Sequence, residues 1–287
     1  MLRRIETVRA LRETIGDWRK AGERIALVPT MGALHAGHRA LVRLGRKAAD
    51  RVIVSIFVNP KQFGKNEDFS RYPRTLEADL AALVEEGADA AFVPAVTEMY
   101  GEGFATEVVV RGLSEPLEGE HRPGHFAGVA TVVTKLLMQS LPDVAVFGEK
   151  DYQQLVIIRR LVTDLDLPVT ILPCPIVREA DGLALSSRNV YLSPTARRIA
   201  PRLYATLCRL KEAAEAGAAP LAQLEEEGHR ELLRAGFEAV DYLTFRDADT
   251  LAPAGDLKRP ARLLATARLE GVRLLDNLAV GPLPAGA

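Results

Sequence analysis

The sequence of 287 residues predicts an α/β protein with two domains: a parallel sheet with crossover helices, and a smaller α+β domain. Over roughly the first 175 residues, short apolar runs alternate with segments of helical periodicity, which is the pattern of parallel strands joined through helices. From about Val177 the sequence becomes charged and rich in Ala and Leu, and strand-like runs return only near its end. We therefore expect a first domain over residues 1–176 and a second over 177–287.

Strands of the first domain are expected at its apolar runs, and helices where apolar residues recur every three or four positions. The runs that predict buried strands are 24–31, 51–58, 90–94, 144–147 and 169–173, and 106–110 is a further candidate with a different pairing. The segments that predict helices are 38–49, 75–86, 129–139 and 151–164.

The second domain is expected to begin with helices and to end with strands. Helical sequence covers 194–235 with an interhelix loop at 213–220, and strand-like runs follow at 239–246 and 261–269. The join between the domains, near 176–189, contains Asp181-Gly182, which favours a turn.

Composition and termini exclude several classes of protein. A net charge of −1 gives no electrostatic footprint for nucleic acid, so no nucleic-acid partner is expected. Cys174 and Cys208 are too few for a disulfide framework or a structural zinc site. The polar start lacks the pattern of a signal peptide, and no apolar run reaches the length of about 18 residues that a membrane span needs. These features predict a cytoplasmic protein with no membrane partner.

The most informative motif joins the first long strand to a helix start through a glycine-containing turn and two histidines. It reads Val28-Pro-Thr-Met-Gly-Ala-Leu-His35-Ala-Gly-His38. The start of a helix offers unpaired backbone N–H groups and the positive end of the helix dipole, so anions bind there, and neighbouring imidazoles donate further hydrogen bonds. We expect these imidazoles to be neutral because the helix dipole disfavours their cationic form. The motif therefore predicts a phosphate site.

Ligands of open α/β sheets lie beyond the carboxyl ends of the strands, and two more segments occupy such positions. Asn59 and Gln62 follow the second long strand and suit a hydroxyl or carboxylate, although Asn59-Pro60 is also an ordinary turn former. The polar stretch 63–74 that follows is a candidate lid. Lys150 ends a later strand, where its ammonium can reach a phosphate, and Asp151 is a good helix cap whatever its other role.

Two further clusters carry weaker signals. Ser186-Ser187-Arg188-Asn189 offers hydroxyls and a guanidinium to phosphate oxygens, but alone such a cluster is more often a turn or a cap. Arg122-Pro-Gly-His125-Phe-Ala-Gly128 is a second helix entry at which Arg122 or His125 could meet a phosphate. Neither cysteine has the neighbouring base that a nucleophile needs.

Taken together, the motifs resemble the pantothenate synthetase (pantoate–beta-alanine ligase) family over nearly the whole chain. The blocks that carry the resemblance, in family order, are Pro29-Thr-Met-Gly-Ala-Leu-His-Ala-Gly-His38, Phe57-Val-Asn-Pro-Lys-Gln-Phe63, Arg122-Pro-Gly-His-Phe-Ala-Gly-Val129, Phe147-Gly-Glu-Lys-Asp-Tyr-Gln-Gln154 and Ser186-Ser-Arg-Asn189. The resemblance implies a Rossmann-like sheet of the HIGH nucleotidyltransferase type. It also implies the ATP- and Mg²⁺-dependent joining of pantoate to beta-alanine through a pantoyl adenylate, with release of AMP and pyrophosphate, in a homodimer.

The resemblance also implies the role of individual residues. Catalytic groups would be His35, His38, Lys150 and Arg188. ATP would contact Met31, Gly32, Ala33, Leu34, His35, Ala36, Gly37, His38, Gly148, Glu149, Lys150, Asp151, Val177, Leu185, Ser186, Ser187 and Arg188. Pantoate and beta-alanine would contact Met31, Asn59, Gln62, Arg122 and Gln154. Mg²⁺ would be held by phosphate oxygens and water, so no protein ligand to the metal is expected.

Two other functions remain open on the residues alone. An adenylyltransferase that stops after nucleotidyl transfer would use the same histidines, and the glutamines at 62 and 154, which suit a small polyol acid, argue against it. A non-enzymatic RNA-binding relative would present a basic face with exposed aromatics, which the near-neutral charge and 6% aromatic content do not favour. Ala36 is a local departure, because the family often has a polar residue there.

Overall fold

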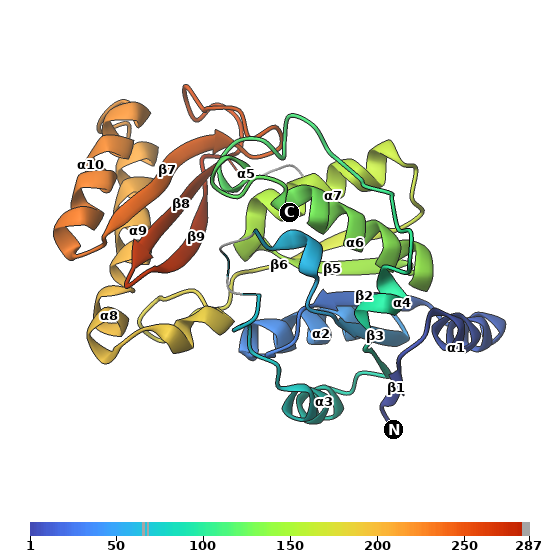
Figure 1. Ribbon diagram of the computed structural model, residues 1–287. Helices are drawn as coiled ribbons and strands as arrows, with labels where there is room; N and C mark the ends of the chain where they lie inside the picture. Colours follow the sequence, from blue (N-terminus) through green and yellow to red (C-terminus); the bar gives the residue numbers. More distant parts are fainter. Residues whose placement is uncertain (65–66, 68, 283–287) are drawn as a thin grey trace. The chain divides into compact units, whose positions relative to one another are not determined.

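The computed structural model of the chain describes residues 1–64, 67 and 69–282. These residues form two compact units (Figure 1). The first comprises Met1–Glu149 and Gln153–Pro175, and the second comprises Lys150–Tyr152 and the described residues from Ile176 onward. The short segment Lys150–Tyr152 thus belongs with the second unit although both of its chain neighbours belong to the first.

The first unit contains a six-stranded parallel sheet, which confirms the predicted α/β class. Its order is β1-β4-β3-β2-β5-β6. Since β2 lies between β3 and β5, the strand order reverses there, and such a switch point is where sheets of this kind bind ligands. The strands are β1 (Arg3–Ile5), β2 (Ile25–Thr30), β3 (Arg51–Ile56), β4 (Ala90–Phe92), β5 (Val144–Gly148) and β6 (Thr170–Cys174).

Helices cover both faces of this sheet because its strands are apolar on both sides (Figure 1). On one face, Ala26 and Val28 of β2 pack with Leu41 of α2 (Ala36–Ala48) and Leu83 of α3 (Leu76–Glu85). On the other face, β2 contacts α6 (His125–Ser140). The remaining elements of the unit are α1 (Val8–Lys20), η1 (Pro60–Gln62), α4 (Val96–Met99), α5 (Glu118–His121) and α7 (Tyr152–Asp164) from its second residue onward. The short η2 (Glu149–Asp151) lies mainly in the second unit.

The second unit packs helices on a three-stranded antiparallel sheet of order β7-β8-β9. Leu207 of α9 and Leu232 of α10 are fully buried in one core with Phe245 of β7 and Leu263 of β8. Its elements are η3 (Ser187–Tyr191), α8 (Pro194–Ile199), α9 (Arg202–Glu215), α10 (Leu221–Ala235), β7 (Ala239–Asp247), β8 (Ala261–Leu269) and β9 (Val272–Val280). The helical stretch expected at 194–235 is divided near Pro201 and Pro220, which precede α9 and α10.

Some element predictions were wrong or incomplete. The segment 106–110 forms no strand, because the N–H of Val108 is bound to the hydroxyl of Thr131 on α6 at 2.9 Å instead of to a neighbouring strand. The helix expected from residue 129 begins at His125, where Gly124 adopts the left-handed conformation at its cap. Sequence periodicity did not identify β1, α1 or β9. Among the described residues, no helix has the length and apolar character needed to cross a membrane.

Candidate active site

The two histidines of the β2–α2 turn are held by the backbone of the helix they begin. His35 is the N-cap of α2, and its Nδ1 accepts the N–H of Gly37 at 3.1 Å. His38 returns the contact, because its Nδ1 accepts the N–H of His35 at 3.3 Å. A backbone N–H can only donate, so both Nδ1 atoms are unprotonated and each neutral ring carries its proton on Nε2. The turn therefore orients two imidazoles with Nε2–H as the donor.

A buried carboxylate fixes the same turn from α3. Asp79 is 2% exposed and accepts the backbone N–H groups of Ala33 at 3.0 Å and Leu34 at 2.8 Å. Gly32 and Ala33 both have positive φ, so this tight turn needs such support. Sequence reasoning missed Asp79, although its spacing from Leu76 and Leu83 places it on the apolar face of the helix, where an unpaired carboxylate would be costly.

These contacts correct one expectation about the phosphate site. Unpaired backbone N–H groups were expected at the start of this helix, but those of Ala33, Leu34, His35 and Gly37 are bound within the protein. The reason is that the turn satisfies its own donors through Asp79 and the histidine caps, as buried backbone groups require. Contact between this turn and a phosphate stays a prediction.

Asn59 and Gln62 meet in the η1 turn beyond β3. Asn59 is 1% exposed, and its amide donates to Gln62 Oε1 at 3.0 Å and to the carbonyl of Gly128 at 3.1 Å. Its Oδ1 accepts the hydroxyl of Tyr100 at 2.8 Å and the N–H of Lys61 at 3.2 Å. The side chain of Asn59 is thus fully engaged in shaping the turn, and direct contact with substrate stays a prediction.

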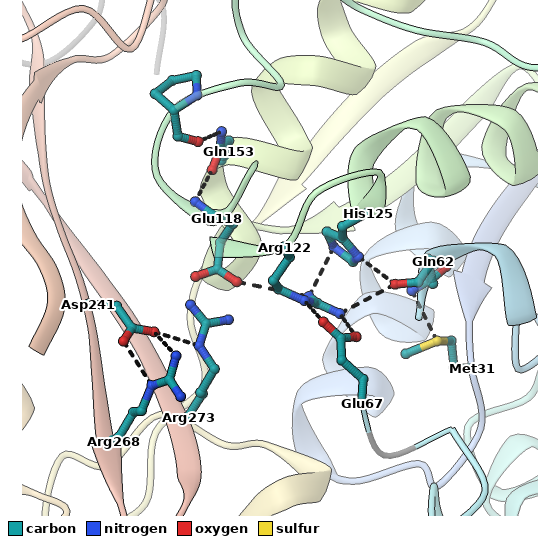
Figure 2. Close-up of polar contacts among 11 residues, drawn as sticks. Met31, Gln62, Glu67, Glu118, Arg122, His125, Gln153, Asp241, Arg268 and Arg273 are labelled. Carbon is teal, nitrogen blue, oxygen red and sulfur yellow. Dashed lines mark hydrogen bonds and ion pairs between the residues drawn. The ribbon is translucent and has the colours of Figure 1, made fainter. Parts of the chain in front are cut away.

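The side chain of Gln62 lies against Met31, so two of the expected substrate contacts come together (Figure 2). Its Nε2 is 3.2 Å from Met31 Sδ, a weak acceptor. An incoming hydroxyl or carboxylate oxygen would be a better acceptor for this amide. Contact between Gln62 and a polar acid stays a prediction.

Arg122 and His125 hold the Gln62 backbone (Figure 2). His125 Nδ1 donates to the Gln62 carbonyl at 2.8 Å, and its Nε2 accepts from Arg122 at 3.1 Å, so the tautomer is fixed by its partners. Burial, reinforced by the charge of Arg122, lowers the pKa of His125 to about 4. The site therefore contains a neutral histidine that serves as a structural donor.

The predicted substrate ligand Arg122 is engaged by a carboxylate of the protein. Its Nε and Nη2 bind Glu67 at 2.7 and 2.6 Å in a two-point ion pair (Figure 2). Burial raises the pKa of Glu67, but the hydrogen bond and charge of Arg122 outweigh burial and hold the pKa below its ordinary value. Within the candidate lid 63–74, the residues at 65, 66 and 68 lie outside the described part of the chain.

Neighbouring glutamines at the start of α7 differ in their surroundings. Gln153 is buried and holds the segment before α5, because it donates to the carbonyl of Leu113. It also donates to the carbonyl of Pro116 and accepts the N–H of Glu118 (Figure 2). Gln154, the expected pantoate ligand, is only half-buried on the first turn of α7. The structure thus gives Gln153 a structural role and leaves the role of Gln154 a prediction.

In the second unit, Lys150 and Ser186 line one narrow cavity together with Asn189, Arg273 and Asp276. Ser186 Oγ accepts the N–H of Arg188 at 3.3 Å and caps η3, so the capping interpretation of this cluster is confirmed. Ser187 and Arg188 lie half-buried in η3. Two of the five lining residues named here, Lys150 and Ser186, were predicted to bind ATP.

The other expected nucleotide contacts differ in position. The N–H of Leu185 donates to the carbonyl of Val177 at 3.0 Å, so these two lie side by side. Gly148 and Glu149 are half-buried at the end of β5. Asp151 is exposed and directly precedes α7, and its capping of that helix stays a prediction. Sequence reasoning missed Arg273, which Asp241 binds at 2.7 Å together with Arg268 (Figure 2). Its local signal is weak, because β9 also contains the polar residues Asp276 and Asn277.

Comparison with known proteins identifies the family. The sequence model described as pantoate-beta-alanine ligase matches residues 3–279. The chain belongs to the pantoate–beta-alanine ligase family. It is 58% identical to the pantothenate synthetase of Paramagnetospirillum magneticum, over 97% of this chain and 98% of that protein. It is 55% identical to the pantothenate synthetase of Halorhodospira halophila, over 96% of this chain and 98% of that protein.

Solved structures of pantoate–beta-alanine ligases have the same fold. The crystal structure of pantothenate synthetase from Thermus thermophilus gives a TM-score of 0.92 at 48% identity, covering 98% of this chain and 100% of that one. The ligase from Francisella tularensis, complexed with beta-gamma ATP and beta-alanine, gives 0.83 at 32% identity, with 97% of each chain covered. This chain is accordingly a pantoate–beta-alanine ligase that condenses pantoate with beta-alanine in an ATP-dependent reaction.

Proposed function

We propose that this ligase works in two steps through a pantoyl adenylate. In the first, a carboxylate oxygen of pantoate attacks the α-phosphorus of ATP, the bond from that phosphorus to the bridging oxygen breaks, and pyrophosphate leaves. In the second, the beta-alanine amine attacks the acyl carbonyl, the acyl–oxygen bond breaks, and AMP leaves while the amine loses a proton. Neither step requires a covalent bond to the protein.

The observation that carries this proposal is the paired capping of His35 and His38. Negative charge develops on the leaving pyrophosphate, and donors that are already oriented stabilise it without reorganisation. The caps leave Nε2–H as the donor of each ring, in a turn held by Asp79. We assign His35 and His38 to the phosphates of ATP on this basis.

Donors of the second unit belong to the same proposal. Lys150 and Ser186 line one cavity, and an ammonium and a hydroxyl are both suitable donors to phosphate oxygens. Arg188, Ser187 and the remaining nucleotide contacts are assigned with them by resemblance to the family. Gln62, with Met31 beside it, is assigned to pantoate because its amide exchanges a weak sulfur contact for an oxygen acceptor.

Mg²⁺ enters this proposal as a companion of ATP. Among the residues that the structure describes, no group of three His, Cys, Asp or Glu side chains is suitably placed to hold a metal ion. A donor set of imidazole, ammonium and hydroxyl fits a metal that is carried by phosphate oxygens and water. When bound, the ion would neutralise phosphate charge. We also propose that the protein is a homodimer in the cytoplasm.

The first step can be tested by exchange of labelled pyrophosphate into ATP. We expect exchange that depends on pantoate and needs no beta-alanine, because the adenylate forms before the amine reacts. Lys150→Ala should reduce this exchange far more than it reduces the conversion of preformed pantoyl adenylate by beta-alanine. Exchange that requires beta-alanine would overturn the two-step sequence, and equal losses in both half-reactions would overturn the role of Lys150.

A further inference from the structure

Lys150 is held through its backbone by a residue near the end of the chain. Asn277 of β9 is 1% exposed, and its Nδ2 donates to the carbonyl of Lys150 at 2.9 Å. Two residues later, the hydroxyl of Tyr152 donates to the carbonyl of Ala248 at 3.0 Å, and the guanidinium of Arg262 lies 4.0 Å above the Tyr152 ring. The segment Lys150–Tyr152 is therefore anchored at both ends to the sheet of the second unit.

The residue beside Asn277 holds the other side of the cavity. Asp276 is 2% exposed and binds both Nη atoms of Arg178, at 2.6 and 2.8 Å. Arg178 also donates to the carbonyl of Gly182 at 3.0 Å, which fixes the turn that leads into Ser186. A two-point ion pair to a buried carboxylate is a rigid connection.

Two adjacent residues of β9 thus bind two separate stretches of chain. Asn277 binds the stretch that carries Lys150, and Asp276 binds the stretch that leads to Ser186, and both stretches line one cavity. We propose that Asp276 and Asn277 are positioning residues that set the place of Lys150 relative to Ser186. Neither needs to touch substrate for this role. The proposal rests on the proposed function of Lys150 in adenylate formation.

The physical reason lies in how strongly phosphoryl transfer depends on placement. Misplacing a positioned group by about 1 Å can cost about a hundredfold in rate. Loss of the Asn277 amide leaves the Lys150 carbonyl without this buried donor, and the chain shifts to satisfy it. The Lys150 side chain moves with its backbone.

A double-mutant cycle on pyrophosphate exchange tests the proposal. Asn277→Ala should lower the exchange rate about 10- to 100-fold with the KM for pantoate unchanged, because Lys150 is displaced. In a Lys150→Ala background the same change should cost less than about threefold, since its target is gone. A purely structural residue would cost the same factor in both backgrounds, and that result would overturn the proposal.

Two further variants distinguish displacement of Lys150 from general damage to the fold. Tyr152→Phe keeps the ring, removes the hydroxyl bond to Ala248, and should slow exchange several-fold in the wild-type background but not in Lys150→Ala. Thr206→Val is the matched control, because it removes a buried hydroxyl bond to Glu231 at 2.8 Å elsewhere in the same unit and should leave exchange unchanged. If Lys150→Ala itself exchanges at the wild-type rate, the proposed function fails, and the positioning role fails with it.

Discussion

The carboxylate of Asp79 accepts the backbone N–H of Leu34 at 2.8 Å, joining α3 to a turn 45 positions earlier in the chain. Its other oxygen accepts the N–H of Ala33, and the hydroxyl of Thr75 completes its partners. A carboxylate of the protein thus binds two backbone N–H groups of the turn, directly before the histidines that we assign to ATP. The shape of the turn is set by contacts within the protein.

Asp79→Asn should damage this turn, because an amide has only one oxygen with which to accept the two N–H groups. We expect pyrophosphate exchange to fall about tenfold or more, and the free energy of unfolding to fall by about 2 kcal/mol. Glu77→Gln, at an exposed position of the same helix, is the control and should change neither value. If Asp79 acted only as a negative charge near ATP, its removal would lower the KM for ATP and leave kcat intact, which would contradict the positioning role.

Gly128→Ala should weaken pantoate binding although it changes no residue that is expected to contact pantoate. A Cβ at Gly128 would lie 2.2 Å from the carbonyl oxygen of Lys61, so the η1 turn that carries Gln62 must move. Overpacking of this kind costs about 1–3 kcal/mol, so we expect the KM for pantoate to rise about tenfold, as it should for Gln62→Ala. Gly16→Ala in α1 is the control, because the added carbon would meet no atom within 4 Å apart from its chain neighbours and the backbone of its own helix. Normal pantoate affinity in Gly128→Ala would show that the turn adapts.

Stability should depend on the protonation of His125. Its pKa is about 4 in the folded chain against 6.5 ordinarily, so the unfolded chain binds the proton more tightly. The free energy of unfolding should therefore fall as pH drops from 6.5 to 4, by about 3 kcal/mol from this group. Arg122, Glu67 and Glu118 surround the ring and remain in the comparison variant His125→Asn, which keeps a donor for the Gln62 carbonyl. Denaturant unfolding at several pH values should show a shallower dependence in that variant, and identical slopes would contradict this origin.

Much of the fold is predictable because the strands of the first sheet are buried on both faces. Runs such as Ile25–Thr30 and Arg51–Ile56 are therefore almost continuously apolar and easily recognised. β9 was missed because Asp276 and Asn277 interrupt its apolar pattern, and these are the residues that hold Arg178 and Lys150. The polar positions that obscure the strand are the ones that organise the cavity.

The sequence offers a local rule for proposing residues that carry chemistry, but none for the residues that hold them in place. The histidine turn, Gln62 and Lys150 stand at the carboxyl ends of strands, where a local rule finds them. Their supports are distant in the chain: Asn277 lies 127 positions after Lys150, and His125 lies 63 positions after Gln62. Such partners have no local pattern, since only the folded chain brings them together.

Pyrophosphate exchange by His38→Asn, with pantoate and ATP but no beta-alanine, tests most directly whether the capped histidines stabilise the departing pyrophosphate. Asparagine keeps an oxygen where Nδ1 accepts the His35 N–H, so the cap and the stability of the chain should persist, while the Nε2–H donor is lost. Exchange should fall by about 10²- to 10³-fold, as it does when a single preorganised donor is removed. A folded variant that exchanges within about threefold of the wild-type rate would contradict the role assigned to His38.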